Sequence, residues 1–332
     1  MTANVKIKDI AKAAGVSAST VSRALTANGF VAAATAEKIR KAAEALNYRP
    51  NFQARSLRTK RSMSILVVVR DIANPFYLEV FKGVEATARE ARYSVLMGNT
   101  EGDPAREEEY FEMVRDGQAD GMILMTGMVP EGYEDQKKKV VVATQMIPDS
   151  GLPHVLIDNA KSAGMAVEHL LSLGHTRIAH ISGPEGEGMS EERKKGFIQT
   201  MENAGMDIPA DYIQEGDYHL GSGLKLTARL LDLPVPPSAI FVANDEMAFG
   251  VLRVAQERGL HIPSELSVIG FDNIHFSQAV FPPLTTINQP RVEIGKCAMK
   301  SLLQLIAGEQ PGNDVVLQTE LVHRATTAAP QN

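Results

Sequence analysis

Residues 7–25 have the sequence IKDIAKAAGVSASTVSRAL, and this stretch decides the fold of the N-terminal part of the chain. Its first portion, 8–14, consists mostly of good helix formers with Ile10 on one face. Gly15 can end this helix, because glycine tolerates the left-handed backbone of a C-terminal cap. The pattern therefore predicts a short helix followed by a tight turn.

A second short helix, 18–25, follows the turn. Ser17 can cap it through its hydroxyl group, and Val21 and Leu25 share one face at a spacing of four residues. A third helix is predicted over 35–46. Two short helices joined by a tight turn that contains glycine form the helix-turn-helix that binds DNA. The alternative is a generic three-helix bundle.

The outward face of the second helix suits a DNA duplex. In a helix-turn-helix, the first residues of this helix reach base edges in the major groove. Small side chains permit close approach, hydroxyl groups bind phosphates, and the guanidinium of Arg23 can bind O6 and N7 of guanine. The residues predicted to contact DNA from this helix are Ser17, Ala18, Ser19, Thr20, Ser22 and Arg23.

Charge is divided unevenly along the chain. Residues 1–61 contain 12 Lys and Arg against 3 Asp and Glu, whereas residues 62–332 contain 22 against 37. The net charge of −6 thus hides a basic head, at +9, on an acidic body, at −15. A polyanion such as DNA is the expected partner of the head alone.

Composition narrows the class of protein. The chain is 44% hydrophobic and 22% charged, and no apolar run approaches the roughly 20 residues of a membrane span. The N-terminal residues lack the apolar core of a signal peptide, and the single cysteine, Cys297, excludes an internal disulfide. We therefore expect a cytoplasmic protein.

No catalytic constellation is evident. Neither a phosphate loop of the GxxxxGK[ST] form nor a GxSxG elbow occurs. The spacing of His169, His175 and His180 fits no usual metal motif. We therefore expect no enzymatic activity, no metal and no cofactor.

The body alternates strands and helices. The continuous apolar run at 64–69, SILVVV, predicts a buried parallel strand. Further strands are predicted at 94–98, 121–125, 140–144, 177–182, 212–215, 239–242 and 267–270, with helices at 76–91, 105–116, 161–173, 191–204, 222–232 and 246–258. Such alternation predicts an α/β core of two Rossmann-like lobes, each with a doubly wound parallel sheet. Ligands bind at the carboxyl ends of such strands, so two facing lobes predict a cleft.

The stretches IKDIAKAAGVSASTVSRAL and TAEKIRKAAEALNYRPN resemble the head of the lactose/galactose repressor (LacI/GalR) family of transcription regulators. The resemblance implies a helix-turn-helix domain at 1–49, a hinge at 50–61 and a core for effector binding and dimerisation at 62–332. In that family the hinge, here PNFQARSL, becomes helical on operator DNA and wedges a leucine into the minor groove. The additional DNA contacts implied here are Asn28, Asn51, Ala54 and Leu57. Residues 50–61 could also serve simply as a basic linker.

The body resembles the same family through VVVRDIANPFY, PSAIFVANDEMAFGVL and PPLTTINQPRVEIG. That core is similar to periplasmic sugar-binding proteins, in which the chain crosses between the lobes three times. Here the resemblance implies crossings near 159–161, 288–291 and 320. It implies a first lobe of about 62–159 plus 291–320, and a second of about 160–290 plus 321–328.

The resemblance also implies which residues bind the effector. Aromatic side chains wall the ligand, while an arginine, an amide and a carboxylate bind its hydroxyl groups, which suits the chemistry of a carboxylate facing a diol. The implied residues are Phe76, Tyr77, Arg193, Tyr218, Asn244, Asp272 and Gln289. Tyr218 could instead belong to the core, and Asp272 could cap a turn.

The identity of the effector follows from a finer similarity. GDYHLGSGLK, LLDLPVPPSAIF and IGFDN resemble the cytidine repressor subgroup of the family, which implies a nucleoside. A flat base suits Phe76 and Tyr218, and a ribose diol suits Asp272 and Arg193. Glu187 and Met189 stand where purine-binding relatives have arginine and threonine, which argues against a free purine base. A monosaccharide is the alternative.

Three local expectations concern the core. Asp245 is a better candidate than Asn244 to cap the helix that follows the strand 239–242. The charge run at 106–109, REEE, is expected to form a solvated helix face, and the tail ATTAAPQN to be disordered.

The sequence thus predicts a ligand-responsive repressor that binds a near-palindromic operator as a homodimer. Some relatives form tetramers through a C-terminal leucine heptad helix, which this chain lacks. Two alternatives remain: an enzyme acting on a nucleoside or sugar, and a constitutive DNA-binding protein whose core serves only dimerisation.

Overall fold

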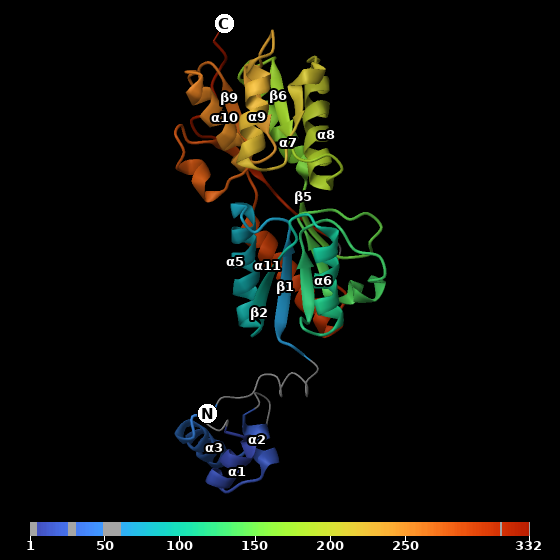
Figure 1. Ribbon diagram of the computed structural model, residues 1–332, viewed down its shortest axis with the longest axis vertical. Helices are drawn as coiled ribbons and strands as arrows, with labels where there is room; N and C mark the ends of the chain where they lie inside the picture. The colour runs from blue at the N-terminus through green and yellow to red at the C-terminus, as the bar shows by residue number, and fades with distance from the viewer. Residues whose placement is uncertain (1–4, 26–30, 49–60, 313, 332) are drawn as a thin grey trace. The chain divides into compact units, whose positions relative to one another are not determined.

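The computed structural model describes residues 5–25, 31–48, 61–312 and 314–331. The chain forms two compact units, Met1–Arg61 and Ser62–Asn332 (Figure 1). No helix in the described part is long and apolar enough to cross a membrane.

The N-terminal unit contains three helices around a small aliphatic core. They are α1 (Ile7–Ala14), α2 (Ala18–Ala24) and α3 (Ala33–Ala45). Ile10, Val21 and Ile39, one from each helix, are fully buried together. The three predicted helices are confirmed, with their ends displaced by no more than two residues.

The first lobe of the larger unit is built on a parallel sheet with strand order β11-β5-β4-β3-β1-β2. The strands are β1 (Ser64–Val69), β2 (Ser94–Asn99), β3 (Gly121–Leu124), β4 (Val140–Ala143), β5 (His154–Ile157) and β11 (Val315–Leu317). The helices are α5 (Pro75–Glu90), α6 (Pro104–Arg115) and α11 (Arg291–Ala307), with a 3-10 helix η1 (Glu134–Lys139).

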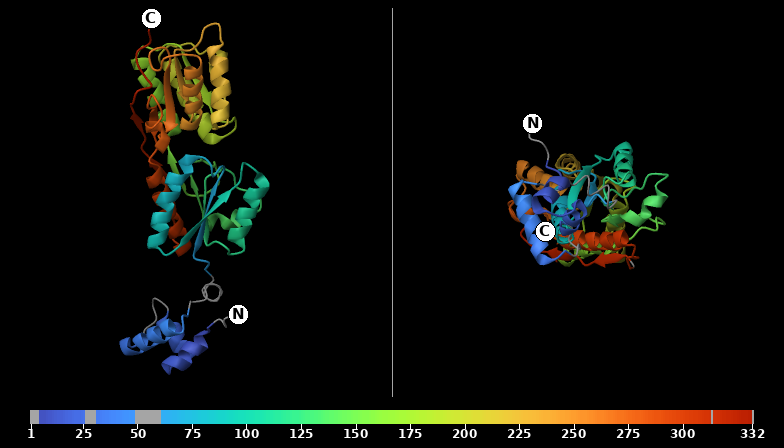
Figure 2. Two further views of the ribbon diagram at one scale, coloured as in Figure 1. Left: turned by 60° about the vertical axis from the view of Figure 1, so that its left-hand side comes forward. Right: turned by 90° about the horizontal axis from the view of Figure 1, so that it is seen from below.

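Alternate side chains of β1 enter different layers. Ile65 and Val67 pack in the layer of α5 and α11, whereas Leu66 and Val68 pack in the layer of α6. Figure 1 shows α5 and α11 on one side of β1 and α6 on the other, and Figure 2 shows the same layers from the side. Burial on both faces explains the uninterrupted apolar run, because a parallel strand covered by helices has no solvated side.

The second lobe has a sheet of order β12-β10-β9-β8-β6-β7, in which only β12 runs antiparallel. The strands are β6 (Ile178–Ser182), β7 (Ile213–Glu215), β8 (Ala239–Val242), β9 (Ser267–Asp272), β10 (Thr285–Asn288) and β12 (Glu320–Val322). The helices are α7 (Asn159–Ser172), α8 (Gly188–Asn203), α9 (Leu220–Leu231) and α10 (Asp245–Glu257), with 3-10 helices η2 (Ala210–Tyr212) and η3 (His275–Gln278).

The chain passes between the two sheets three times. It leaves the first sheet after β5 to enter α7, returns from β10 to α11, and passes from β11 to β12. Because β10, β11 and β12 come late in the chain, each lobe is completed by segments remote in sequence. This topology brings the carboxyl ends of the two sheets toward one cleft.

Two features of the core differ from expectation. The sequence pattern did not predict β5, β10, β11, β12 or α11, and hydrogen bonds hold the described part of the tail, 325–331, where disorder was expected. The hydroxyl of Thr326 donates to the carbonyl of Val268 at 2.7 Å, and the backbone N–H of Val268 donates to the carbonyl of Thr326 at 2.8 Å. These bonds hold the tail along β9. The small and polar side chains of the tail gave no sign of this contact in the sequence.

Candidate functional site

The turn of the N-terminal unit has the geometry that its sequence predicts. Gly15 ends α1 with a φ of 68°, in the left-handed region. Ser17 then caps α2, because its hydroxyl oxygen accepts a hydrogen bond from the backbone N–H of Thr20 at 3.1 Å. Both the glycine turn and the serine cap are confirmed.

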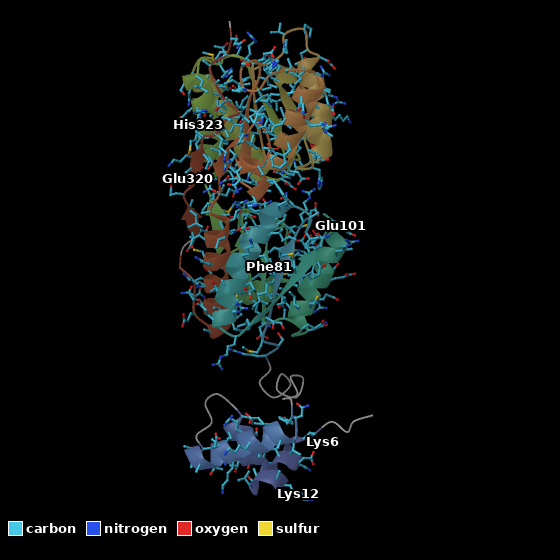
Figure 3. All side chains as sticks on the ribbon, turned by 90° about the vertical axis from the view of Figure 1, so that its left-hand side faces the viewer. Lys6, Lys12, Phe81, Glu101, Glu320 and His323 are labelled. Carbon is cyan, nitrogen blue, oxygen red and sulfur yellow. The ribbon has the colours of Figure 1, made fainter. Side chains whose placement is uncertain are left out.

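The outer face of α2 is polar and accessible. Ser17, Ser19 and Arg23 are exposed, while Ala18, Thr20 and Ser22 are half-buried. The hydroxyl of Ser17 lies 2.7 Å from that of Ser19 and 2.8 Å from that of Thr20. Exposed Lys6 and Lys12 add positive charge on α1 and beside it (Figure 3). The predicted contacts Asn28, Asn51, Ala54 and Leu57 lie outside the described residues.

In the larger unit, all seven predicted effector residues line one small pocket. Its volume is about 30 Å³. The lining residues are Asn74, Phe76, Tyr77, Thr144, Met189, Arg193, Tyr218, Asn244, Asp272 and Gln289. They come from both lobes: α5 and the end of β4 on one side, and α8, α10 and the end of β9 on the other. The cleft topology therefore assembles a set that is dispersed over more than 200 residues of chain.

Arg193 is held rigidly in this pocket. It is 3% exposed, and its guanidinium lies 3.7 Å from the centre of the Phe271 ring. Its Nε donates to Oδ1 of Asn159 at 2.9 Å, and its Nη1 donates to the carbonyl of Ala243 at 2.6 Å. Nη2 has only a long contact, 3.9 Å, to the sulfur of Met189. Because sulfur is a weak acceptor, Nη2 remains available to a ligand.

Asp272 faces the same pocket from the end of β9. It accepts a hydrogen bond from Nε2 of Gln289 at 2.7 Å on one oxygen, and the other oxygen has no partner in the described part of the chain. Burial raises the pKa of Asp272 to about 7; Arg193 opposes the shift and Asp245 adds to it. A carboxyl group that titrates near neutral pH and has one oxygen free to accept a hydrogen bond suits the hydroxyl groups of a ligand.

Two hydroxyl groups, one in the pocket lining and one just outside it, have no hydrogen-bond partner among the described residues. They are those of Tyr218 and Ser190, and both are buried. Burial raises the pKa of Tyr218 to about 12, and the nearby Ser190 hydroxyl opposes this shift, but the two groups do not reach hydrogen-bond geometry. Buried polar groups without partners are rare in proteins, so a ligand or water is expected to satisfy them.

Asn244, and not Asp245, caps α10. The amide oxygen of Asn244 accepts from the backbone N–H of Met247 at 3.0 Å, and its Nδ2 donates to the carbonyl of Tyr218 at 2.8 Å. The expectation for Asp245 was wrong because its carboxylate points into the lobe. There it accepts from Ser277 at 2.6 Å, among other donors. Asn244 thus lines the pocket and also fixes its wall.

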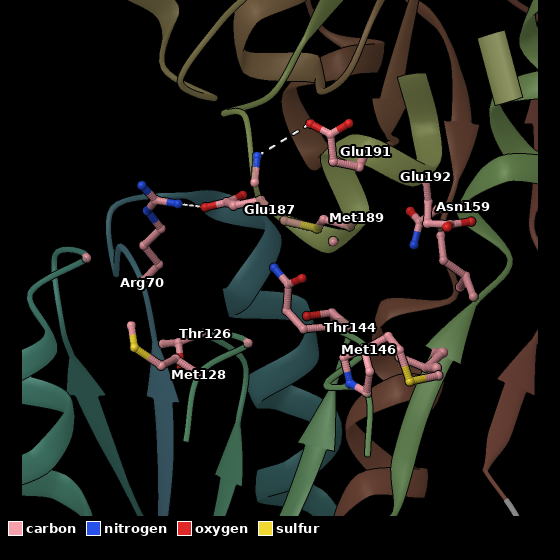
Figure 4. Close-up of a pocket in the computed structure, with 18 of the residues that line it drawn as sticks. Arg70, Thr126, Met128, Thr144, Met146, Asn159, Glu187, Met189, Glu191 and Glu192 are labelled. Carbon is pink, nitrogen blue, oxygen red and sulfur yellow. Dashed lines mark hydrogen bonds and ion pairs between the residues drawn. The ribbon is translucent and has the colours of Figure 1, made fainter. Parts of the chain in front are cut away.

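A much larger chamber adjoins the small pocket. Its volume is about 830 Å³, and Thr144 and Met189 line both cavities. Arg70 and Glu187 form an ion pair across it, from the loop after β1 to the N-cap of α8 (Figure 4). Drug-sized ligands need roughly 300–1,000 Å³, so the chamber has room for a ligand that the small pocket alone lacks.

The comparisons with known proteins agree along the whole chain. Residues 6–51 match bacterial regulatory proteins of the lacI family, and residues 167–327 match the periplasmic binding protein-like domain. The HTH-type transcriptional repressor CytR of Escherichia coli (strain K12) is 39% identical over 328 residues, which cover 97% of this chain and 96% of that protein. The chain belongs to the LacI family.

Two further relatives extend this result. Catabolite control protein A of Priestia megaterium is 37% identical over 326 residues, covering 97% of each chain. The crystal structure of the lac repressor dimer bound to operator and the anti-inducer ONPF superposes with a TM-score of 0.88 at 29% identity, covering 98% of this chain and 100% of that one.

As a LacI-family protein, the chain is a DNA-binding transcription regulator with an effector-binding domain. Its relatives are regulators and not enzymes. The predicted family, the two-part fold and the regulatory function are confirmed. Sequence reasoning did not identify Asn74 or Thr144 as pocket residues, nor Ser190, whose unpartnered hydroxyl lies near Tyr218 just outside the lining. Ser190 lies in the first turn of α8, three residues before Arg193, and that spacing places both side chains on one helix face.

Proposed function

We propose that this LacI-family regulator is a repressor that binds a near-palindromic operator as a homodimer in the cytoplasm, and that a nucleoside in the cleft controls its affinity for the operator. The observation that carries the effector assignment is the pocket itself. It combines a buried arginine, a free carboxylate oxygen and the unpartnered hydroxyl group of Tyr218 with aromatic walls. A core used only for dimerisation has no need of such a set.

The volumes of the two cavities suggest how a nucleoside divides between them. The small pocket, about 30 Å³, cannot hold a base and a ribose together. Hydroxyl groups of the ribose can reach Asp272 and Arg193 at the edge of this pocket, while the ring and the base lie past Thr144 and Met189 in the chamber. This arrangement replaces the simpler expectation of a base stacked between Phe76 and Tyr218.

The lobes provide the route from effector to DNA. The pocket is lined by both lobes, and the chain crosses between them three times. A ligand that binds one degree of closure more tightly shifts the lobes toward it, by no more than its differential affinity. Closure alters the spacing of the two segments that lead to the DNA-binding heads, and therefore the fit to both half-sites.

Exposed apolar side chains support the homodimer. Leu78 on α5 and Leu96 on β2 are exposed, at 50% and 43%. β2 is also an edge strand of its sheet. Large exposed apolar side chains beside a sheet edge are typical of a protein interface.

Thermal melts of the full chain against nucleosides, bases and monosaccharides test the effector. A ligand at 100 times its Kd stabilises the folded state by about 2.7 kcal/mol, which shifts Tm by several degrees. A shift with nucleosides supports the proposal. A shift with monosaccharides alone would mean that the effector is a sugar. If no compound shifts Tm, the assignment of an effector is wrong.

A binding titration against operator DNA tests the head. Replacing a side chain that binds guanine with both arms costs about 1–3 kcal/mol, so Arg23→Ala should weaken specific binding by at least about fivefold. Arg40→Ala is the matched control, because Arg40 is already paired with Glu37 and Glu44 on α3. Equal losses in the two variants would exclude α2 as the recognition helix.

A further inference from the structure

The chamber has a buried carboxyl group in its wall. Glu107, in the first turn of α6, lines the chamber and is 2% exposed. The hydroxyl of Thr126 donates to its Oε1. Its Oε2 has no hydrogen-bond partner, and no basic side chain pairs with the group, in the part of the chain that the structure describes. The expectation of a solvated face for 106–109 was therefore wrong at Glu107.

A second buried carboxyl group of the same protein shows what a structural role requires. Asp245 accepts from Ser277 and Thr286, both at 2.6 Å, and from the backbone N–H of Ile274 at 2.9 Å. Glu107 also has two carboxyl oxygens, but only one group, the hydroxyl of Thr126, donates a hydrogen bond to them. Glu107 lines the chamber, and its free oxygen is not among the buried atoms that lack a partner, so its hydrogen-bond partner comes from the cavity, as a ligand or as water.

The charges around the chamber limit that partner. Five acidic residues line it: Glu107, Asp158, Glu187, Glu191 and Glu192. Arg70 is the sole lysine or arginine in the described lining, and it is already paired with Glu187. The backbone N–H of Gly186, at the start of α8, faces Oε1 of Glu191 at 3.4 Å. A phosphate group would meet carboxylates without a free cation, whereas a group that donates hydrogen bonds would meet acceptors.

We propose that Glu107 is a specificity-determining residue of the effector site, and that the chamber around it binds a non-phosphorylated ring that carries an amino group. This inference rests on the proposed function and extends it from the small pocket to the chamber. Burial, opposed by Thr126, holds the pKa of Glu107 near 7. Glu107 therefore has an accessible ionised form that accepts from N–H groups.

Isothermal titration of the full-length protein with matched nucleosides tests the proposal. Adenosine and inosine, and likewise cytidine and uridine, differ by one amino group that is replaced by a carbonyl. We expect the wild-type protein to prefer at least one amino nucleoside by about tenfold, the range of one charge-assisted hydrogen bond. Glu107→Leu should reduce that ratio to about threefold or less, and Glu107→Gln, which keeps one acceptor, should give an intermediate ratio.

The ratio separates recognition from folding, because loss of folded protein weakens both members of a pair equally. Glu109→Gln, an exposed neighbour on α6, is the matched control and should leave the ratio unchanged. The wild-type protein should also bind the amino nucleoside at least about tenfold more tightly than its monophosphate.

Each outcome bears on a different claim. Nucleoside binding with a ratio that neither substitution of Glu107 changes overturns the role of Glu107 and leaves the proposed function intact. Equal binding of a nucleoside and its monophosphate overturns the exclusion of phosphate. Absence of binding by all four nucleosides overturns the proposed effector class and this inference with it.

Discussion

The small pocket and the chamber each contain a buried carboxyl group whose pKa burial raises to about 7, Asp272 in one and Glu107 in the other. Their surroundings differ. Asp272 lies near Arg193 and accepts from Gln289, which follows β10 at a crossing between the lobes. Glu107 has the single donor Thr126, from its own lobe. The two carboxyl groups therefore have similar pKa values but different hydrogen-bond partners and different places in the cleft.

The difference separates two tasks within one cleft. The small pocket is lined by both lobes, so a ligand that fills it contributes directly to the free energy of lobe closure. Glu107 and Thr126 belong to the first lobe alone, so a contact there can select among ligands with less influence on closure. Four predictions, from the largest expected effect to the smallest, test this separation.

Removal of the Asp272 carboxylate should have the largest effect. Asp272→Asn keeps the shape of the side chain but removes an acceptor for two hydroxyl groups, and each charged hydrogen bond contributes about 1.5–3 kcal/mol. We expect about a 100-fold or greater loss of effector affinity, measured by titration calorimetry. Glu109→Gln is the control. A loss of less than about threefold would place the diol elsewhere in the cleft.

The pH dependence of unfolding should report the same carboxyl group. Because the pKa of Asp272 is about 7 in the folded state against an ordinary value of 3.8, the folded protein retains a proton that the unfolded chain releases. Its contribution to stability is present below pH 4 and is lost as the pH rises through 7. The unfolding free energy of the wild type relative to Asp272→Asn should fall by about 2–3 kcal/mol from pH 5 to pH 8.

Urea denaturation at the two pH values measures this difference. Glu107, whose pKa is also raised, remains in both proteins and cancels, whereas the charge coupling between Asp245 and Asp272 forms part of the measured difference. A difference that does not change with pH would show that Asp272 is ionised in the folded state across this range.

A methyl group at Gly183 should damage the pocket without touching the chamber. A Cβ there would lie 2.2 Å from Cζ of Tyr218, so the ring must move. Overpacking costs about 1–3 kcal/mol, and we expect Gly183→Ala to weaken effector binding by about tenfold. The control is Gly221→Ala, where a Cβ would meet no atom within 4 Å. Gly183→Ala should leave unchanged the ratio of affinities for amino and carbonyl nucleosides that we assign to Glu107. Loss of that ratio would mean that the two cavities act as one.

The ion pair between Arg70 and Glu187 should give the smallest effect. It joins the two lobes, but the Arg70 side chain is 44% exposed and therefore screened by solvent. A double-mutant cycle with Arg70→Ala and Glu187→Ala should give a coupling of about 0.2–1 kcal/mol in effector binding. A coupling of zero would mean that the pair does not contribute to closure.

Local patterns determined much of the fold. The helix-turn-helix depends on contacts within about forty residues, and Gly15, Ser17 and Val21 have the roles that their spacing predicted. The strand 64–69 was predicted with its observed bounds, because burial on both faces leaves a continuous apolar run. In contrast, β10 was missed because its sequence, TTIN, is short and polar, and its burial comes from neighbours far along the chain.

The sequence by itself determined the family and the two-part fold, since helix caps, apolar periodicity and family motifs are local, and the resemblance to that family predicted the seven residues that line the small pocket. Only the tertiary structure decided that the pocket is small, that Asn244 caps α10, and that Glu107 is buried in an acidic run and faces a chamber. Burial and cavity volume are sums over segments distant in sequence. No local pattern around a glutamate reveals whether its carboxyl group meets solvent or the inside of a cleft.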